Sequence, residues 1–163
     1  DFKIRPLYYE HFLAYFSSGH QLLKNEQISR SQLDPNEMWL LQDGHCFKDQ
    51  IVNFCAVPMS SEAACANIHF RSGSLDTLRR LIQTGMGYTL IPALMAASLR
   101  KDEIAAHVRP FKSPIPTREI SIIYRRDHWK LAIIEAIEMT IRQNLPEVIS
   151  QTPDKGYKVL DVC

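Results

Sequence analysis

The chain has 163 residues, of which 45% are hydrophobic and 23% charged, a composition that suits one domain or two small lobes and argues against global disorder. Its formal net charge is +1, so the chain itself lacks the basic excess that indicates nucleic-acid binding. The longest apolar runs fall well short of the roughly 18 residues that a membrane span requires, and no segment has a secretory signal pattern. We therefore expect no membrane association and a cytoplasmic protein with reduced thiols.

The first quarter of the chain predicts strands separated by turns. Residues 2–16 are rich in aromatic and β-favouring residues, which predicts one or two strands. Residues 17–37 contain turn formers with room for one helical turn, and residues 38–42 predict a short buried strand. Because the chain opens on a strand-like run without methionine, we interpret it as a fragment of a longer protein.

The middle of the chain predicts alternating strands and helices. Residues 68–74 predict a strand that ends in a turn, and residues 88–92 predict another strand. Between them, residues 75–84 predict an amphipathic helix with Ser74 as its N-cap and Gly85 as its C-cap. A short helix is expected to open at Pro92.

The last third predicts a linker, a strand, a long helix and a tail. Residues 107–118 contain several prolines, which predicts a linker, and residues 119–126 predict a strand. Residues 129–145 predict the strongest helix of the chain, and the tail that follows is expected to be loosely held. Alternating strands and helices predict an α/β protein with a mostly parallel sheet. Hinge points near Phe12 and Thr117 would divide it into two lobes.

Two of the four cysteines, Cys46 and Cys55, lie nine positions apart in a segment that predicts a helix after Asp43-Gly44. A cysteine near a helix N-terminus has a lowered pKa, and His45 and Lys48 add positive charge nearby. On a helix, nine residues span roughly 13.5 Å and place the thiols on opposite sides. A disulfide needs Cα atoms within about 7 Å, so the two cysteines can form one only if the helix unfolds. The segment would then have two states, helical when the thiols are reduced and unfolded when they are oxidised.

Two other interpretations of these thiols stay open at this point. Both cysteines could be ordinary buried residues, because free cysteine is among the most buried residue types. A zinc site would use Cys46, Cys55, Cys65 and His69, but their spacing fits no compact ligand pattern, so we expect no metal. Cys65 is expected to be a packed thiol, and Cys163 receives no role.

Several motifs resemble one known family. The run "SLDTLRRLIQTGMGYTLIPAL" resembles the effector domains of LysR-type transcriptional regulators, and "DGHCFKDQIVNFC", "HFRSGSLDTLRR" and "REISIIYRR" are similar to the peroxide-sensing members of that family. The resemblance covers roughly Arg5 to Leu145. It implies an α/β fold of two Rossmann-like lobes of the periplasmic-binding type. Residues 13–116 would form lobe II, residues 1–12 and 117–145 part of lobe I, and residues 146–163 a tail. An N-terminal winged helix-turn-helix domain would be absent.

The resemblance also implies roles for individual residues. Cys46 would be the peroxidatic cysteine that becomes a sulfenic acid, and Cys55 the resolving cysteine that closes an intramolecular disulfide. Arg118 would stabilise the reactive thiolate. The remaining expected pocket residues are His45, Asp49 and His69. A dimer interface is expected to use Leu75, Leu78 and Ile82.

We therefore expect the chain to be the regulatory domain of a transcriptional regulator that senses hydrogen peroxide. The intramolecular disulfide would change the conformation of the domain and activate an oxidative-stress response. Expected partners are a second copy in a homodimer or tetramer, DNA through the missing N-terminal domain, RNA polymerase, and glutaredoxin or thioredoxin as reductant, with no cofactor. One alternative is a LysR-type domain that binds a small-molecule effector. A thiol peroxidase or disulfide oxidoreductase is a third interpretation, but the CxxC motif of thioredoxin-like sites is absent, so we expect no enzyme.

Overall fold

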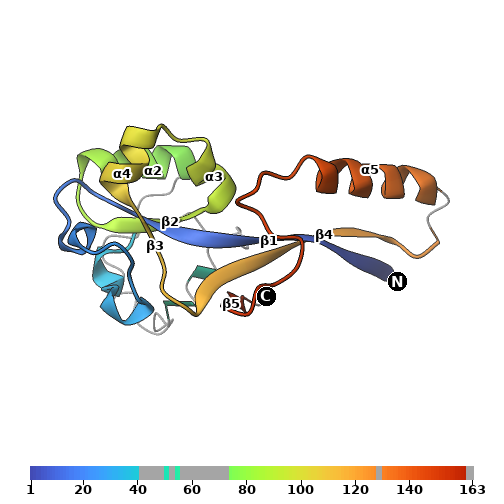
Figure 1. The fold of residues 1–163 in the computed structure, drawn as a ribbon, viewed down its shortest axis with the longest axis horizontal. Helices are drawn as coiled ribbons and strands as arrows, with labels where there is room; N and C mark the ends of the chain where they lie inside the picture. Colours follow the sequence, from blue (N-terminus) through green and yellow to red (C-terminus); the bar gives the residue numbers. More distant parts are fainter. Residues whose placement is uncertain (41–49, 52–53, 56–73, 128–129, 161–163) are drawn as a thin grey trace.

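One long strand, β1 (Phe2–Phe16), runs the length of the molecule and organises the fold (Figure 1). The structure is a computed structural model that describes residues 1–40, 50–51, 54–55, 74–127 and 130–160. In these ranges the sheet has the order β2-β1-β4-β5, with β3 also paired to β1. The other strands are β2 (Tyr88–Pro92), β3 (Val108–Pro110), β4 (Ile115–Arg125) and β5 (Tyr157–Val159).

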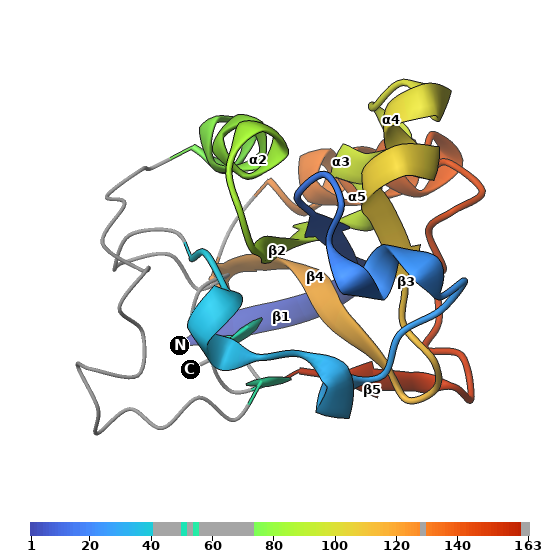
Figure 2. The same cartoon turned by 90° about the vertical axis from the view of Figure 1, so that its left-hand side faces the viewer.

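The helices lie in two groups. Figures 1 and 2 show α2, α3 and α4 gathered over one end of β1, with α5 lying along the other end. Their bounds are α2 (Leu75–Thr84), α3 (Ala93–Ala97), α4 (Lys101–His107) and α5 (Leu131–Gln143). Three 3-10 turns, Gln21–Lys24, Arg30–Gln32 and Pro35–Glu37, replace the single turn expected after β1. No helix within the described ranges is long and apolar enough to cross a membrane.

The strand β1 changes neighbours part-way along its length. From Phe2 to His11 it pairs with β4, and from Phe12 to Phe16 it pairs with β2. At the change, His11 lies opposite Thr117. The two predicted hinge points therefore lie side by side where the pairing switches, although the lobe boundaries themselves stay a prediction.

The predicted mostly parallel sheet is wrong for the described residues. β1 is antiparallel to β2, β3 and β4, and the parallel pair found in these ranges is β4 with β5. The strands β2 and β3 run in the same direction with α3 and α4 between them, as in a parallel crossover. However, β1 lies between the two strands and runs the opposite way, which an alternation of strands and helices does not reveal.

Both faces of the C-terminal part of β1 are buried, and side chains alternate between two core clusters as strand geometry requires. Phe12, Ala14 and Phe16 enter the first cluster, while Tyr15 enters the second, below α2. The first cluster continues into the 3-10 turns, β2 and the helical residues 51 and 54. Because neither face is open to solvent, this stretch reads as a nearly continuous apolar run.

Local signals account for several confirmed elements. The helix α2 begins after Ser74, whose hydroxyl accepts a hydrogen bond from Thr77 N–H, and its C-cap is Gly85, as predicted. The predicted strand at residues 88–92 is β2, and the long C-terminal helix is α5. The predicted strand at residues 119–126 is part of β4, which begins earlier.

Other predicted elements differ. Residues 38–42 were expected to form a strand, but within residues 38–40 Met38 makes one isolated bridge to Tyr88. The expected linker at residues 107–118 instead contains the end of α4, β3 and the start of β4. Its prolines are compatible with strands because Pro110 is the last residue of β3 and Pro116 lies in the short pairing with β5.

The expected loose tail is in fact anchored. Ser150 exchanges backbone hydrogen bonds with Tyr9, and β5 pairs with the start of β4. Ile149 and Leu160 are each less than a tenth exposed, and Leu160 joins the first core cluster. Two apolar side chains therefore hold a segment whose polar composition suggested solvent exposure.

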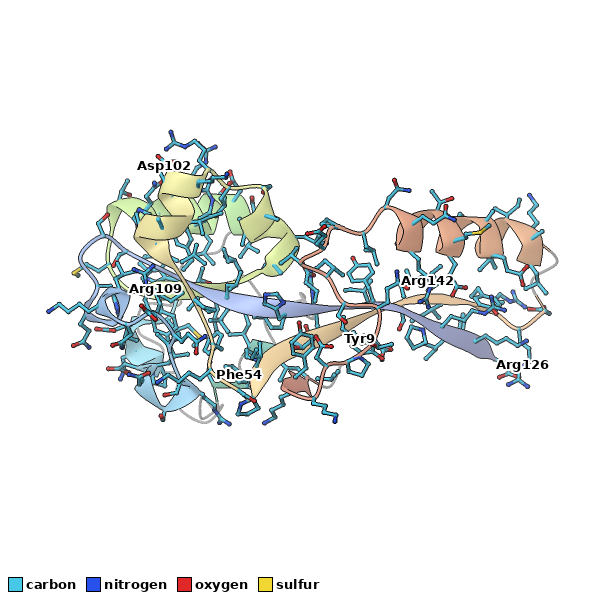
Figure 3. The ribbon with its side chains drawn as sticks, in the orientation of Figure 1. Tyr9, Phe54, Asp102, Arg109, Arg126 and Arg142 are labelled. Atoms are coloured by element: carbon cyan, nitrogen blue, oxygen red, sulfur yellow. The ribbon has the colours of Figure 1, made fainter. Side chains whose placement is uncertain are left out.

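Polar contacts join the helix α5 to the ribbon formed by β1 and β4. Arg142 donates a hydrogen bond to the Pro6 carbonyl, and Figure 3 shows this arginine between α5 and the ribbon. Arg5 of β1 donates to Glu138 at 3.3 Å. The exposed large hydrophobic residues of this end are Phe2, Ile4, Ile123, Leu131, Ile133, Ile137 and Met139.

Arg109 joins three segments near β3 through backbone carbonyls (Figure 3). Its guanidinium donates to Leu23 and Val108 at 2.7 Å and to Asn25 and Ala105 at 2.9 Å. An ammonium cannot reproduce this planar set of donors. We therefore expect Arg109→Lys to lower the free energy of unfolding by about 2 kcal/mol, measured by urea denaturation.

Arg100→Lys is the matched control for this substitution. Arg100 is exposed and makes a surface ion pair with Asp102 at 3.4 Å, so its replacement should change stability by less than about 0.5 kcal/mol. Equal unfolding midpoints for the two variants would contradict the role given to Arg109.

Candidate functional site

The structure describes two of the predicted redox-site residues, Cys55 and Arg118. The other predicted residues, His45, Cys46, Asp49 and His69, lie outside the described residues, as do Cys65 and Cys163. The site is therefore built from the surroundings of Cys55 and of Arg118.

Cys55 belongs to a helical segment, as predicted, because residues 50, 51, 54 and 55 are helical. Ile51 and Phe54 are buried in the first core cluster, and Cys55 packs against it. Phe54, labelled in Figure 3, meets Phe111 edge-on with ring centroids 5.4 Å apart. Arg30 lies over the same phenyl ring at 5.6 Å. The helix thus holds Cys55 at the margin of a packed aromatic cluster.

Burial raises the pKa of the Cys55 thiol to about 12, and the nearby charge of Arg30 opposes this rise. At pH 7 a thiol with such a raised pKa is almost entirely protonated. Tyr88 lies within electrostatic reach, since its own pKa is raised mainly by burial and then by the Cys55 charge. Because the thiolate is the nucleophile, Cys55 is unreactive while it stays packed.

Arg118 lies on β4 directly opposite Glu10 on β1. Its Nε and Nη2 donate to one oxygen of Glu10, Oε2, at 2.9 and 2.7 Å. The other oxygen, Oε1, accepts a hydrogen bond from the Leu94 N–H at 2.8 Å. The guanidinium also lies over the Phe12 ring, 5.8 Å from its centroid. This arrangement fixes a cation beside the point where β1 changes neighbours.

Sequence reasoning missed a second buried polar cluster, between β1, α2 and α4. Arg79 of α2 forms an ion pair with Glu103 of α4, and the Tyr15 hydroxyl donates to the same carboxylate at 2.8 Å. Asp76 binds the Arg79 guanidinium at 2.7 Å, and His107 stacks on Tyr15. Burial, and then Glu103, raise the pKa of Tyr15 to about 12. The pattern D-x-x-R in α2 was visible, but its partner in α4 was not.

The three residues expected at a dimer interface differ in exposure. Leu78 and Ile82 are fully buried within one chain, in the second core cluster, and therefore have no surface to offer a partner. Leu75 is partly buried against the same cluster. The interface stays a prediction, and of the three residues Leu75 alone has exposed surface to contribute. Within the described ranges, no group of three or more His, Cys, Asp or Glu side chains is placed to hold a metal ion.

Comparison with known proteins agrees with this architecture. The model of the LysR substrate binding domain matches residues 1–146. The chain belongs to the LysR substrate-binding domain family. The match confirms the predicted α/β fold class of LysR-type effector domains, with a mixed sheet in place of the parallel one.

Relatives of this LysR substrate-binding domain are named as peroxide-responsive regulators. It is 31% identical over 140 residues to the "Hydrogen peroxide-inducible genes activator" of Pectobacterium carotovorum subsp. carotovorum, covering 86% of this chain and 45% of that protein. It is 34% identical over 120 residues to the "DNA-binding transcriptional dual regulator OxyR" of Escherichia coli K12, covering 74% of this chain and 38% of that protein. The chain thus spans less than half the length of these relatives.

A solved structure gives the same result. The reduced OxyR of Porphyromonas gingivalis is 30% identical, with a TM-score of 0.81, and the match covers 97% of this chain and 70% of that one. The resemblance of this LysR substrate-binding domain to OxyR, seen in its sequence motifs, is thereby confirmed.

Proposed function

We propose that this LysR substrate-binding domain senses hydrogen peroxide and thereby regulates transcription, with Cys46 as the reacting thiol and Cys55 as its resolving partner. The observation that carries the proposal is the packing of Cys55 against the first core cluster, in a helical segment nine residues after a second cysteine. Relatives named as hydrogen peroxide-inducible activators support the choice of oxidant.

The proposed chemistry has two steps. The Cys46 thiolate attacks one oxygen of hydrogen peroxide, the O–O bond breaks, and a sulfenic acid forms while hydroxide leaves and is protonated to water. The Cys55 thiol then loses its proton, and its sulfur attacks the sulfenic sulfur. The S–O bond breaks, the S–S bond forms and a second water leaves. Two thiols are oxidised by two electrons in total, and one peroxide is reduced to two waters.

The burial of Cys55 separates these two steps. While Cys55 is packed against the core, its protonated sulfur does not compete for peroxide. If residues 46–55 form the helix that the sequence predicts, disulfide formation requires Cys55 to leave the segment in which Ile51 and Phe54 are buried. We propose that this release is the conformational signal, an order-to-disorder change driven by one covalent event.

The remaining parts of the proposal concern partners. Regulation would use DNA binding by a further domain, contact with RNA polymerase, and assembly as a homodimer or tetramer. Glutaredoxin or thioredoxin would reduce the disulfide by thiol exchange and reset the sensor. One relative is named as a DNA-binding transcriptional dual regulator, which supports the proposed DNA binding. The contact with RNA polymerase, the oligomeric state and the reductant stay expectations.

The deciding experiment is mass spectrometry of the protein after treatment with about one equivalent of peroxide and alkylation of the remaining free thiols. We expect one disulfide, between Cys46 and Cys55, with Cys65 and Cys163 recovered in alkylated form. Recovery of Cys46 as an alkylated thiol after peroxide treatment would refute the proposal. Denatured protein is the control, because there Cys55 loses the protection of the core and the four thiols should oxidise without selectivity.

A further inference from the structure

Phe54 is held in the core by two segments that are far from it in the sequence. Its side chain is 3% exposed and belongs to the first core cluster. The Phe111 ring meets it edge-on, and the central carbon of the Arg30 guanidinium lies 5.6 Å from its ring centroid. Cys55 is the next residue along the chain, so the contacts that hold Phe54 also determine how readily Cys55 can leave the core.

The backbone that carries Arg30 is fixed to the segment that carries Phe111. Ile28 is fully buried, and its N–H and carbonyl make backbone hydrogen bonds of 3.0 and 2.7 Å to the residues on either side of Phe111. Arg30 then begins a 3-10 turn in which the Ser29 N–H donates to the Gln32 side chain at 2.8 Å. The guanidinium is therefore presented to the Phe54 ring from a fixed base, although the arginine itself is exposed.

Arg30 acts on this part of the core in two opposite ways. As a cation over an aromatic face, it favours the packed position of Phe54 and of the thiol beside it. As a charge near Cys55, it opposes the rise in the pKa of the thiol and so favours the reactive thiolate. The pKa of Cys55 nevertheless stays at about 12 with Arg30 in place, so the packed thiol is protonated at pH 7 and the first action has the larger consequence.

We propose that Arg30 is a positioning residue that covers Phe54, holds Cys55 in the core and thereby sets how readily this thiol becomes available for disulfide formation. This inference rests on the proposed function, in which Cys55 is the resolving thiol. Arg30 acts through the Phe54 ring, so removal of its charge should release Cys55 more often.

The test is the rate at which a thiol reagent alkylates Cys55 in the reduced, folded protein, followed by mass spectrometry of the Cys55 peptide. A packed, protonated thiol reacts when it is transiently released, so the rate reports how often release occurs. Arg30→Gln removes the charge and keeps a planar polar group. We expect Cys55 to be labelled about two- to fivefold faster in this variant than in the unsubstituted protein. Arg30→Lys keeps a cation near the ring and should restore most of the protection.

Three further variants separate this effect from general changes in charge or stability. Arg100→Gln makes the same change in net charge at an exposed position and should leave the labelling rate of Cys55 unchanged. In a Phe54→Leu background, Arg30→Gln should have little further effect, because the ring through which it acts is gone. Arg109→Lys destabilises the whole fold, so it should accelerate labelling only if Cys55 is released by global unfolding.

The inference is overturned if Arg30→Gln leaves the labelling rate of Cys55 unchanged, or if it accelerates labelling equally with and without the Phe54 ring. A slower rate in Arg30→Gln would overturn it as well, because that is the result expected if Arg30 acts chiefly on the thiolate. Acceleration by Arg109→Lys greater than that by Arg30→Gln would assign the release of Cys55 to global unfolding, with the same consequence.

This measurement needs no peroxide and is therefore separate from the test of the proposed function. A protein that forms no disulfide after peroxide treatment would refute the proposed function, while the effect of Arg30 on the release of Cys55 would still be measured. Unchanged labelling in a protein that does form the disulfide would refute the role of Arg30 alone.

Discussion

Replacing Cys46 by Ser is expected to abolish the reaction with peroxide, because a serine hydroxyl is not ionised near neutral pH and its oxygen does not form a sulfenic acid. A reagent specific for sulfenic acids should give no signal above background, and no disulfide should form at any peroxide concentration that oxidises the unsubstituted protein. Peroxide-dependent transcription should be lost completely, since no later step can replace the missing sulfur.

Cys55→Ser is the complementary variant, and Cys65→Ser is the matched control. Without Cys55 the sulfenic acid has no resolving thiol, so its signal should persist for longer than in the unsubstituted protein. Cys65→Ser should behave like the unsubstituted protein. A transcriptional response that survives in Cys46→Ser would instead favour a small-molecule effector, and continued peroxide consumption with thioredoxin would favour a thiol peroxidase.

The substitution Gly87→Ala is expected to cause the largest loss of stability, about 3–5 kcal/mol. Gly87 has φ of +89°, a region that side chains disfavour, and an added Cβ would overlap the Glu37 carbonyl oxygen and contact the Trp39 indole nitrogen at 3.0 Å. The Gly87 carbonyl also accepts a hydrogen bond from Ser17 N–H at 2.9 Å, so the backbone cannot move away without breaking it. Denaturant unfolding followed by tryptophan fluorescence measures the loss.

Gly19→Ala is the matched control, because Gly19 also has a positive φ but an added Cβ there overlaps no other atom. Gly19 has φ of +76°, but nothing lies within 4 Å of an added Cβ. Only the conformational cost of about 1 kcal/mol is expected. If the free energy of unfolding falls equally in both variants, the close approach of the Glu37 carbonyl is not the reason that position 87 requires glycine.

Elements with local signals were predictable from sequence, and elements that depend on distant partners were not. The helix α2 has its cap residue and apolar face within one short segment, so its bounds followed from Ser74 and Gly85. The strand β5 has only three residues and forms because β4, some 40 positions earlier, offers it an edge. The short helix α4 is polar and lies before several prolines, which concealed it.

The same distinction applies to the candidate site. The spacing of Cys46 and Cys55 is a local property, and the helical residues around Cys55 agree with the helix it predicted. The pairing of Glu10 with Arg118 joins residues 108 positions apart and depends on the strand register, which no local pattern indicates. A glutamate within the aromatic-rich part of β1 was the signal available, because a buried carboxylate implies a cation across the sheet.

The continuity of β1 has a consequence for how the two ends of the molecule are related. One strand supplies Phe2–His11 to the ribbon beneath α5 and Phe12–Phe16 to the core beneath α2. Because strand side chains alternate, a slip of one residue at either end would turn every following side chain to the wrong face. In the pairing with β4, β1 carries one extra residue between Pro6 and Tyr8, so this bulge sets the face on which Glu10 and the later side chains of β1 lie.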